Sequence, residues 1–404
     1  MAAKKAIANQ FVRISALPAL VLALAGFLEA GQASHPRTSQ QSNLAMLAAR
    51  KRVLGARLLA LYYYYPDTRG IASLKARAAE MTLLGPQSFK VEADGVVRGE
   101  VPAQVLELAR AAKLPVMPLV VNPGFDRPTA SAMLRNPKAQ ERAATYLAYL
   151  AKRDNYVGWQ LDLEYIDPAD KALYTKFVRR VAARLHADGR LLSIAVVPRF
   201  SDHYPDTRAA EFRTGEWGAP FDFRAIGQAV DFMVLMTYDH HTTGTPPGPV
   251  AGYTWIKEAL EYAVRRVPRH KLVMGIPFYG REWVETANGT LSRSLGFSDL
   301  QPLLERPGLE VQWDKRWRTP WLEFRDGSEL HTIWFDDGRS FKEKLDLVRQ
   351  YRLRGFAAWR LGSEDPEFWP IAAEMSKKPA AAATRRPAPR PRQRSSEGGS
   401  SRSQ

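Results

Sequence analysis

The 404-residue chain contains no cysteine. Disulfide bonds, thiolate metal sites and a thiol nucleophile are therefore excluded. A domain of this length can bury enough core to be stable in an oxidising compartment without disulfides, so export remains compatible with the composition. No glycine-rich phosphate-binding loop follows the first apolar strand candidate, which argues against a Rossmann dinucleotide fold.

Acidic residues are in deficit, with 42 Asp and Glu against 58 Lys and Arg and a formal net charge of +16. Part of the excess lies in residues 376–404, which are rich in alanine, proline and arginine and then in serine and glycine. We expect this segment to be a disordered, solvated tail. Binding to an anionic envelope surface or to nucleic acid is the alternative. The tail has no aromatic residues to stack on bases, so no specific nucleic-acid partner is expected.

Only one apolar run is a candidate for membrane targeting. Basic residues precede residues 14–28, and small residues follow at 31–33. This layout predicts a signal peptide at 1–33 and an exported protein, periplasmic or secreted, with no stable membrane span after leader removal. A buried or amphipathic first helix and an uncleaved membrane anchor are the alternatives. Pro18 and the shortness of the run argue against the anchor.

Apolar segments recur at fairly even intervals along the rest of the chain. Segments that are apolar on both faces and alternate with amphipathic stretches, such as residues 171–186 and 253–266, indicate a parallel α/β sheet. Eight of them fit a closed (β/α)8 TIM barrel better than an open sheet. The strand candidates are residues 58–64, 81–84, 116–121, 158–164, 192–197, 232–238, 272–277 and 355–359.

One stretch, at about residues 282–335, breaks this regularity with short alternating segments. Within it, residues 321–334 read as a hairpin with Gly327 at the turn. We predict a small β-rich insertion after strand seven that walls one side of the barrel mouth. The barrel domain is expected at 57–375, after a polar or helical lead-in at 34–56.

The strand candidate at residues 158–164 carries the most informative polar residues. Alternation places Gln160, Asp162 and Glu164 on one face, and the carboxyl end of a barrel strand opens into the mouth. Burial and the charge of Asp162 would raise the pKa of Glu164 and keep it protonated near neutral pH, as a general acid requires. The alternative is a structural pair of acids that binds arginine or caps the next turn, and the spacing alone does not decide between them.

Four segments of the chain carry recognisable motifs: residues 158–164 (GWQLDLE), 236–239 (MTYD), 275–281 (GIPFYGR) and 355–365 (GFAAWRLGSED). These segments resemble glycoside hydrolase family 18, the chitinase-like barrels. The last of them is similar to the branch that includes spore-cortex glycosidases. The resemblance runs from about residue 58 to residue 370, and four motifs in the family's order make it specific.

This resemblance implies retaining hydrolysis of a polymer containing β-linked N-acetylglucosamine, in which the acetamido oxygen of the substrate is the nucleophile. Glu164 would be the general acid and then the base. Asp162 would hold the acetamido N–H, and Tyr238 would hydrogen-bond the acetamido carbonyl. Trp359 would form the apolar floor beneath the sugar. Further substrate-binding residues implied by the motifs are Gln160, Met236, Asp239, Tyr279 and Arg281.

Several of these residues also have purely structural alternatives. Trp359 and Tyr238 could be core residues of a barrel, and Arg281 could pair with Asp239 or Glu282.

The adjacent residues His240 and His241 raise the question of a metal site. Neighbouring side chains of an extended segment point to opposite sides, and no acidic partner lies at ligand spacing. We therefore expect neither a metal nor another cofactor.

The chain departs from the family pattern at Val157 and Gln160, where the motif has aspartates. Gln160 can hydrogen-bond Asp162 but cannot take a proton, so Asp162 should be protonated less often than in a chitinase. Residues 120–124 also lack the family's Ser-x-Gly-Gly and are closer to the spore-cortex branch. Peptidoglycan or a similar polymer is therefore favoured over chitin. The alternative function is that of a catalytically weak or inactive glycan-binding protein. The sequence does not indicate an oligomeric state.

Overall fold

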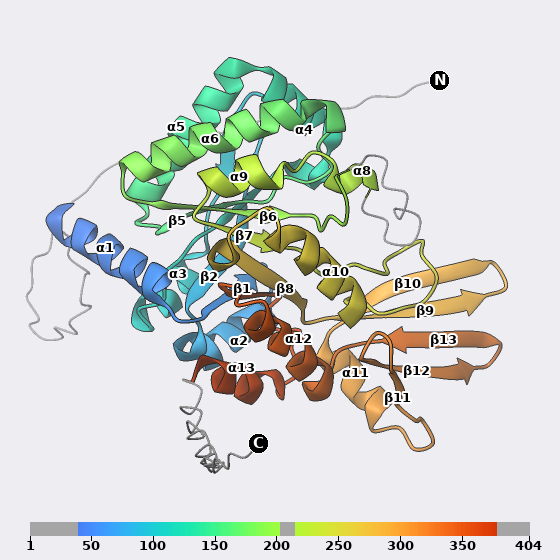
Figure 1. The fold of residues 1–404 in the computed structure, drawn as a ribbon. Coiled ribbons are helices and arrows are strands. Elements are labelled where there is room, and N and C mark those ends of the chain that lie inside the picture. The colour runs from blue at the N-terminus through green and yellow to red at the C-terminus, as the bar shows by residue number, and fades with distance from the viewer. Residues whose placement is uncertain (1–38, 203–214, 378–404) are drawn as a thin grey trace, which may run out of the picture.

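The computed structural model describes residues 39–202 and 215–377, so the predicted signal peptide and most of the predicted tail lie outside the described residues. Eight parallel strands close into a barrel surrounded by helices (Figure 1), which confirms the predicted (β/α)8 fold. Closure comes from β1, which pairs with both β2 and β14. Within the described ranges, no helix is long and apolar enough to cross a bilayer. The barrel strands are β1 (Leu59–Tyr64), β2 (Leu83–Val91), β4 (Leu119–Val121), β5 (Gly158–Leu161), β6 (Leu191–Val196), β7 (Phe232–Leu235), β8 (Leu272–Pro277) and β14 (Gly355–Trp359).

Each predicted strand overlaps an observed one, and the largest differences are at the carboxyl ends. β2 continues to Val91 and pairs with the short antiparallel strand β3 (Val97–Gly99). β5 and β7 end earlier than predicted, at Leu161 and Leu235. The polar residues at the ends of these two predicted strands therefore lie in the loops at the barrel mouth.

Apolar side chains fill both sides of the barrel wall. Alternate residues of the strands, such as Leu59, Leu61 and Tyr63 of β1, form a buried cluster inside the barrel. The intervening residues pack in a larger cluster with the surrounding helices. The helices of this outer layer are α2 (Thr68–Arg77), α3 (Ala103–Ala111), α4 (Arg127–Arg135), α5 (Pro137–Arg153), α6 (Lys171–Ala187), α8 (Gly215–Gly218), α9 (Phe223–Ala229), α10 (Tyr253–Val264), α12 (Gly338–Gln350) and α13 (Phe368–Ser376). Short 3₁₀ helices lie at Ala78–Glu80, Pro123–Phe125, Pro168–Asp170 and Arg269–Lys271.

The first described helix, α1 (Ser39–Gly55), covers the amino-terminal end of the barrel. Val53 is fully buried in the cluster inside the barrel, and Ala49 packs against the same cluster. Arg354, directly before β14, donates a hydrogen bond to the carbonyl of Val53. Arg52 donates to a carbonyl that precedes β2, that of Met81, at 2.9 Å. The lead-in segment is thus a helix that closes the base of the barrel.

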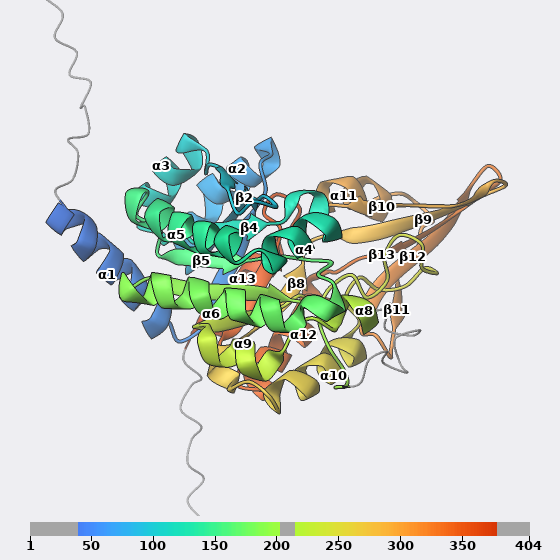
Figure 2. The same cartoon turned by 90° about the horizontal axis from the view of Figure 1, so that it is seen from above.

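The predicted β-rich insertion is a five-stranded antiparallel sheet that follows β8, the seventh strand of the barrel. Its β12 and β13 form the predicted hairpin, with Gly327 at the turn in the left-handed region (φ 58°). The sheet projects from the molecule on the side away from α1 (Figures 1 and 2). Its elements are β9 (Gly280–Thr286), β10 (Gly289–Leu295), α11 (Phe297–Leu304), β11 (Gln312–Asp314), β12 (Thr319–Asp326) and β13 (Glu329–Trp334).

Candidate active site

The segment of β5 and its following loop carries two carboxylates into the barrel mouth. Trp159, Leu161 and Leu163 pack in the outer apolar cluster, and the indole N–H of Trp159 donates to a carbonyl of α5 at 2.8 Å. The alternate residues therefore face the barrel axis, as predicted from the spacing. Asp162 is buried, whereas Glu164 is partly exposed at the rim.

Burial changes the acidity of both carboxyl groups. It raises the pKa of Asp162 to about 6, against an opposing hydrogen bond from Gln87. The pKa of Glu164 is raised well above its usual value, first by burial and then by the charges of Asp162 and Asp239. A carboxyl group in this environment stays protonated at a pH where an exposed glutamate is ionised, so Glu164 can donate a proton to a leaving group.

Gln87, which the sequence did not single out, holds Asp162. Its side-chain amide donates to Oδ2 of Asp162 at 3.3 Å. The pairing of β2 with β4 shifts register between Gln87 and Phe89, and this bulge turns Phe89 outward into the apolar cluster. The expectation that Gln160 could fill this role is wrong, because its amide donates to Oγ of Ser193 on β6 at 2.7 Å.

Asn122, at the end of β4, clamps the backbone of Glu164. Its side-chain oxygen accepts from the backbone N–H of Glu164 at 3.0 Å. Its amide nitrogen donates to the carbonyl of Glu164 and to that of Asp126, each at 3.1 Å. Asn122 is fully buried, so these bonds have no competition from water. The sequence shows Asn122 in the segment that departs from the family pattern but gives no sign of this contact.

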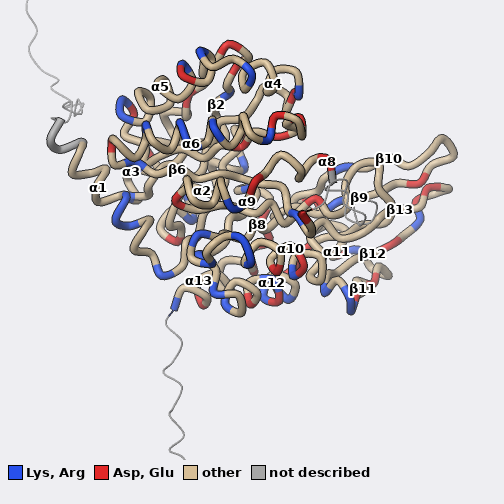
Figure 3. Tube along the Cα trace, turned by 45° about the horizontal axis from the view of Figure 1, so that its top comes forward, with Lys and Arg blue, Asp and Glu red and all other residues tan. Residues whose placement is uncertain are grey.

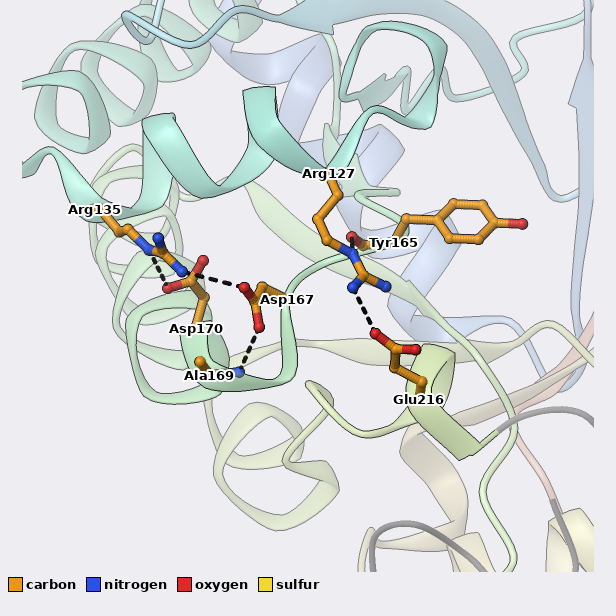
Figure 4. Close-up of polar contacts among 7 residues, drawn as sticks. All are labelled: Arg127, Arg135, Tyr165, Asp167, Ala169, Asp170 and Glu216. Carbon is orange, nitrogen blue, oxygen red and sulfur yellow. Dashed lines mark hydrogen bonds and ion pairs between the residues drawn. The ribbon is translucent and has the colours of Figure 1, made fainter.

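Two arginines of α4 hold the loop that follows Glu164 (Figure 4). Arg127 donates to the carbonyl of Tyr165 at 3.2 Å and forms an ion pair with Glu216 of α8 at 2.5 Å. Arg135 pairs with the buried carboxylate of Asp170 at 2.8 Å. The carboxylates of this loop and of α8 thus bind arginine, which leaves Glu164 outside the ion pairs.

Tyr238 reaches the site because β8 carries a glycine beside it. A Cβ atom on Gly275 would lie 2.8 Å from the Tyr238 ring and 2.5 Å from the carbonyl of Leu235. Thr237 donates to the carbonyl of Gly275 at 2.7 Å and locks the two segments together. The charge of Asp162 contributes to raising the pKa of Tyr238, after the larger effect of burial. Two of the motifs therefore meet at this contact.

Asp239, Tyr279 and Arg281 form a polar cluster next to Glu164. The Tyr279 hydroxyl donates to Oδ1 of Asp239 at 2.7 Å, and Arg281 lies 3.5 Å from the same oxygen. Burial raises the pKa of Asp239, although both partners oppose this effect. The pairing of Arg281 with Asp239, raised above as a structural alternative, is thus present. Glu282 pairs instead with Arg293, at 2.6 Å.

The remaining predicted residues differ in how far they are accessible. Trp359 is half-buried at the end of β14, and its ring centroid lies 5.4 Å from that of Tyr63. Met236 is buried in the main apolar cluster. Of the buried polar atoms without a hydrogen-bond partner among the described residues, three belong to residues near this site: the Tyr63 hydroxyl, Oε1 of Gln160 and Oδ1 of Asp162. Such atoms can accept or donate hydrogen bonds to a bound ligand.

The two adjacent histidines do not point apart, contrary to the expectation from their spacing. The ring centroids of His240 and His241 lie 4.5 Å apart, and His240 stacks on Trp255 of α10 at 4.8 Å. Burial lowers the pKa of His240 to about 2. Across residues 39–202 and 215–377, no group of three or more histidine or acidic side chains is placed to hold a metal ion.

Comparisons with known proteins identify the family of this chain. Residues 105–365 match the model of the glycosyl hydrolases family 18. An uncharacterized glycosylase of Bacillus subtilis, YvbX, is 28% identical over 313 residues, which cover 76% of this chain and 88% of YvbX.

Two solved structures share the fold over 79% of this chain, each with a TM-score of 0.71. A chitinase from Chromobacterium violaceum is 28% identical, and the match covers 98% of it. The spore cortex-lytic enzyme SleL of Bacillus megaterium is 27% identical, with 74% covered. The chain therefore belongs to glycoside hydrolase family 18 and is a glycosidase.

Proposed function

We propose that this glycosidase cleaves a polysaccharide containing β-linked N-acetylglucosamine by a retaining, substrate-assisted mechanism. The observation that carries the proposal is the pair of Asp162 and Glu164, in which burial and the charges of Asp162 and Asp239 raise the pKa of Glu164 at the barrel mouth. We assign the proton to Glu164, because its partial exposure would let a substrate reach it.

In the first step, Glu164 transfers its proton to the glycosidic oxygen as the bond from that oxygen to C1 breaks. The acetamido oxygen of the same sugar forms a bond to C1 and yields an oxazolinium ion. Oδ1 of Asp162, which has no partner among the described residues, accepts the acetamido N–H and offsets the positive charge. In the second step, ionised Glu164 takes a proton from water as that water attacks C1 and the bond from C1 to the acetamido oxygen breaks, which restores the acetamido group. The two displacements at C1 together retain the configuration.

Tyr238 and Trp359 supply orientation in this mechanism. The charges of Asp162 and Glu164 contribute to raising the pKa of Tyr238, so its hydroxyl lies near both carboxylates. In the mechanism this hydroxyl donates a hydrogen bond to the acetamido carbonyl and aligns it for attack on C1. The half-buried ring of Trp359 supports the apolar face of the sugar. Asp239, Tyr279 and Arg281 form the polar wall beside it.

Peptidoglycan is the substrate we favour over chitin. The resemblance to spore cortex-lytic SleL and the amide at Gln160 in place of an aspartate support this choice. The similarity to a chitinase keeps chitin-like polymers as the second candidate. We also propose that the protein is exported, on the strength of the leader-like layout of residues 1–33, which lie outside the described residues.

The alternative is a glycan-binding protein that turns substrate over weakly or not at all. The test compares wild type with Glu164→Gln on purified peptidoglycan and on fluorogenic N-acetylglucosamine oligomers. Glu310→Gln, at an exposed position of the insertion, is the matched control.

We expect turnover by wild type and by the control, and a loss of at least about 10³-fold in Glu164→Gln. Equal turnover by all three proteins would remove Glu164 from its role. Binding without turnover by any of them would support the glycan-binding alternative.

A further inference from the structure

The end of the barrel opposite Glu164 has a basic surface that the hydrolytic mechanism does not use. We call it the basal face, and it comprises α1 and the loops that precede the barrel strands. Two hollows of about 430 and 340 Å³ lie on this face and share Gln228 and Lys271 in their walls. Their basic lining residues are His186, Arg224, Arg266, His270, Lys271 and Arg354.

Several of these basic side chains donate hydrogen bonds to uncharged groups. Lys271 donates to two main-chain carbonyls, at 2.9 and 2.8 Å, and Arg354 and Arg52 likewise donate to carbonyl oxygens. A carbonyl bond fixes a side chain without neutralising its charge. Arg266 and His186 differ: Arg266 pairs with Asp202, and His186 lies 2.9 Å from Asp231, which also lines one of the hollows. The basal face therefore keeps a positive potential, and Lys and Arg positions gather along and below α1 in Figure 3.

A row of leucines lies next to these charges on α1. Leu44, Leu47 and Leu54 are 62%, 51% and 38% exposed, although Val53 on the same helix is fully buried. With the exposed Lys51, the row follows the spacing of a single helical stripe. Leu54 also lines one of the two hollows, so the apolar row and the basic hollows are continuous.

We propose that the basal face docks on an anionic phospholipid surface. Exposed leucines beside lysine and arginine are the combination that holds a helix in the headgroup region, where apolar burial and attraction to lipid phosphates act together. Nucleic acid would use the charges but not the leucines. Since the basal face and the mouth lie at opposite ends of the strands, docking turns Glu164 away from the membrane.

The absence of cysteine from the chain makes this orientation measurable. Leu44→Cys places a single thiol on the basal face, and Leu291→Cys places one on β10, where the native leucine is 67% exposed. Each full-length variant is labelled with an environment-sensitive fluorophore and mixed with phosphatidylcholine vesicles, with or without phosphatidylglycerol. We expect a blue-shifted, stronger signal from position 44 with anionic vesicles only, and no change from position 291.

Charge variants separate docking from the effect of the apolar run at residues 14–28. Lys51→Gln combined with Arg57→Gln should weaken the vesicle response at position 44 roughly 25-fold, about fivefold for each basic residue near the surface. Lys138→Gln combined with Arg325→Gln, at exposed sites away from the basal face, should leave it unchanged. Equal signals from positions 44 and 291, a response insensitive to the basal charges, or a stronger response to duplex DNA than to vesicles would each overturn the proposal.

Discussion

The mouth and the base of the barrel are built from the same eight strands but place charge in opposite ways. At the mouth, Asp162 and Glu164 are withdrawn from water and their pKa values rise. At the base, Lys271 and Arg354 donate hydrogen bonds to main-chain carbonyl oxygens, which carry no net charge. The groups with raised pKa values at the mouth are those that the mechanism uses, whereas α1 at the base packs against the barrel interior. Substitutions at the mouth should therefore alter kinetics, and those at the base should alter stability.

The largest effect after that of Glu164→Gln is expected for Tyr238→Phe. Loss of the hydroxyl removes alignment of the acetamido oxygen, so kcat should fall about 100-fold with little change in KM. Tyr174→Phe is the matched control, because that buried hydroxyl of α6 has no partner among the described residues. Steady-state kinetics on an N-acetylglucosamine oligomer distinguish the two. A loss confined to KM would contradict the alignment role of Tyr238.

Asn122→Asp should have the next largest effect. Aspartate can still accept from the N–H of Glu164, but it cannot donate to the two carbonyls that Asn122 binds. We expect kcat/KM to fall roughly tenfold and the free energy of unfolding to fall by about 1–3 kcal/mol. The control is Asn136→Asp, because Asn136 caps α5 through its oxygen alone. Unchanged kcat/KM in Asn122→Asp would show that the clamp does not position Glu164.

At the base, Val53→Ala should lower the free energy of unfolding by roughly 1–3 kcal/mol, because a buried side chain leaves a cavity. The kcat should remain that of wild type. Leu47→Ala, at an exposed position of the same helix, should change neither quantity. Denaturant unfolding measures the free energy of unfolding, and steady-state kinetics measure kcat. A large fall in the kcat of Val53→Ala would contradict the claim that the base affects stability and not catalysis.

The smallest effect is a shift in pH dependence. Gln87 stabilises the ionised form of Asp162, so Gln87→Met should raise the pKa of that carboxyl further. Since the mechanism needs Asp162 ionised, the acidic limb of the kcat/KM profile should move to higher pH, by roughly half a unit to one unit. Gln160→Met should move it less, because that amide donates to Ser193. The opposite order of shifts would contradict the assignment.

Local pattern predicted the strands and the paired carboxylates but not the contacts between strands. Apolar runs located all eight strands, and alternation placed Asp162 and Glu164 on the inner side. Gln87 and Asn122 were not predicted, because each reaches the site from another strand. The bulge in β2 also changes the alternation of inward and outward side chains, so the direction of Gln87 could not be predicted from the sequence pattern.

Other differences arise where tertiary packing overrides local geometry. The two histidine rings meet because the chain after β7 is not extended, with Asp239 in the left-handed region (φ 57°). The sequence indicated a helix before the barrel but not that Val53 would seal its base. Apolar residues lie on both the exposed and the buried sides of α1, so only the contacts reveal which side packs against the barrel.

The most direct test of the account is a carbon-13 NMR titration of the carboxyl group of Glu164 in wild type and in Asp162→Asn. The resonance is identified by its absence from Glu164→Gln. We predict that Glu164 titrates above the ordinary glutamate range, and that Asp162→Asn lowers this pKa because a neighbouring charge is lost while burial remains. An ordinary pKa in wild type, or one unchanged by Asp162→Asn, would contradict the claim that the two carboxylates act as a pair.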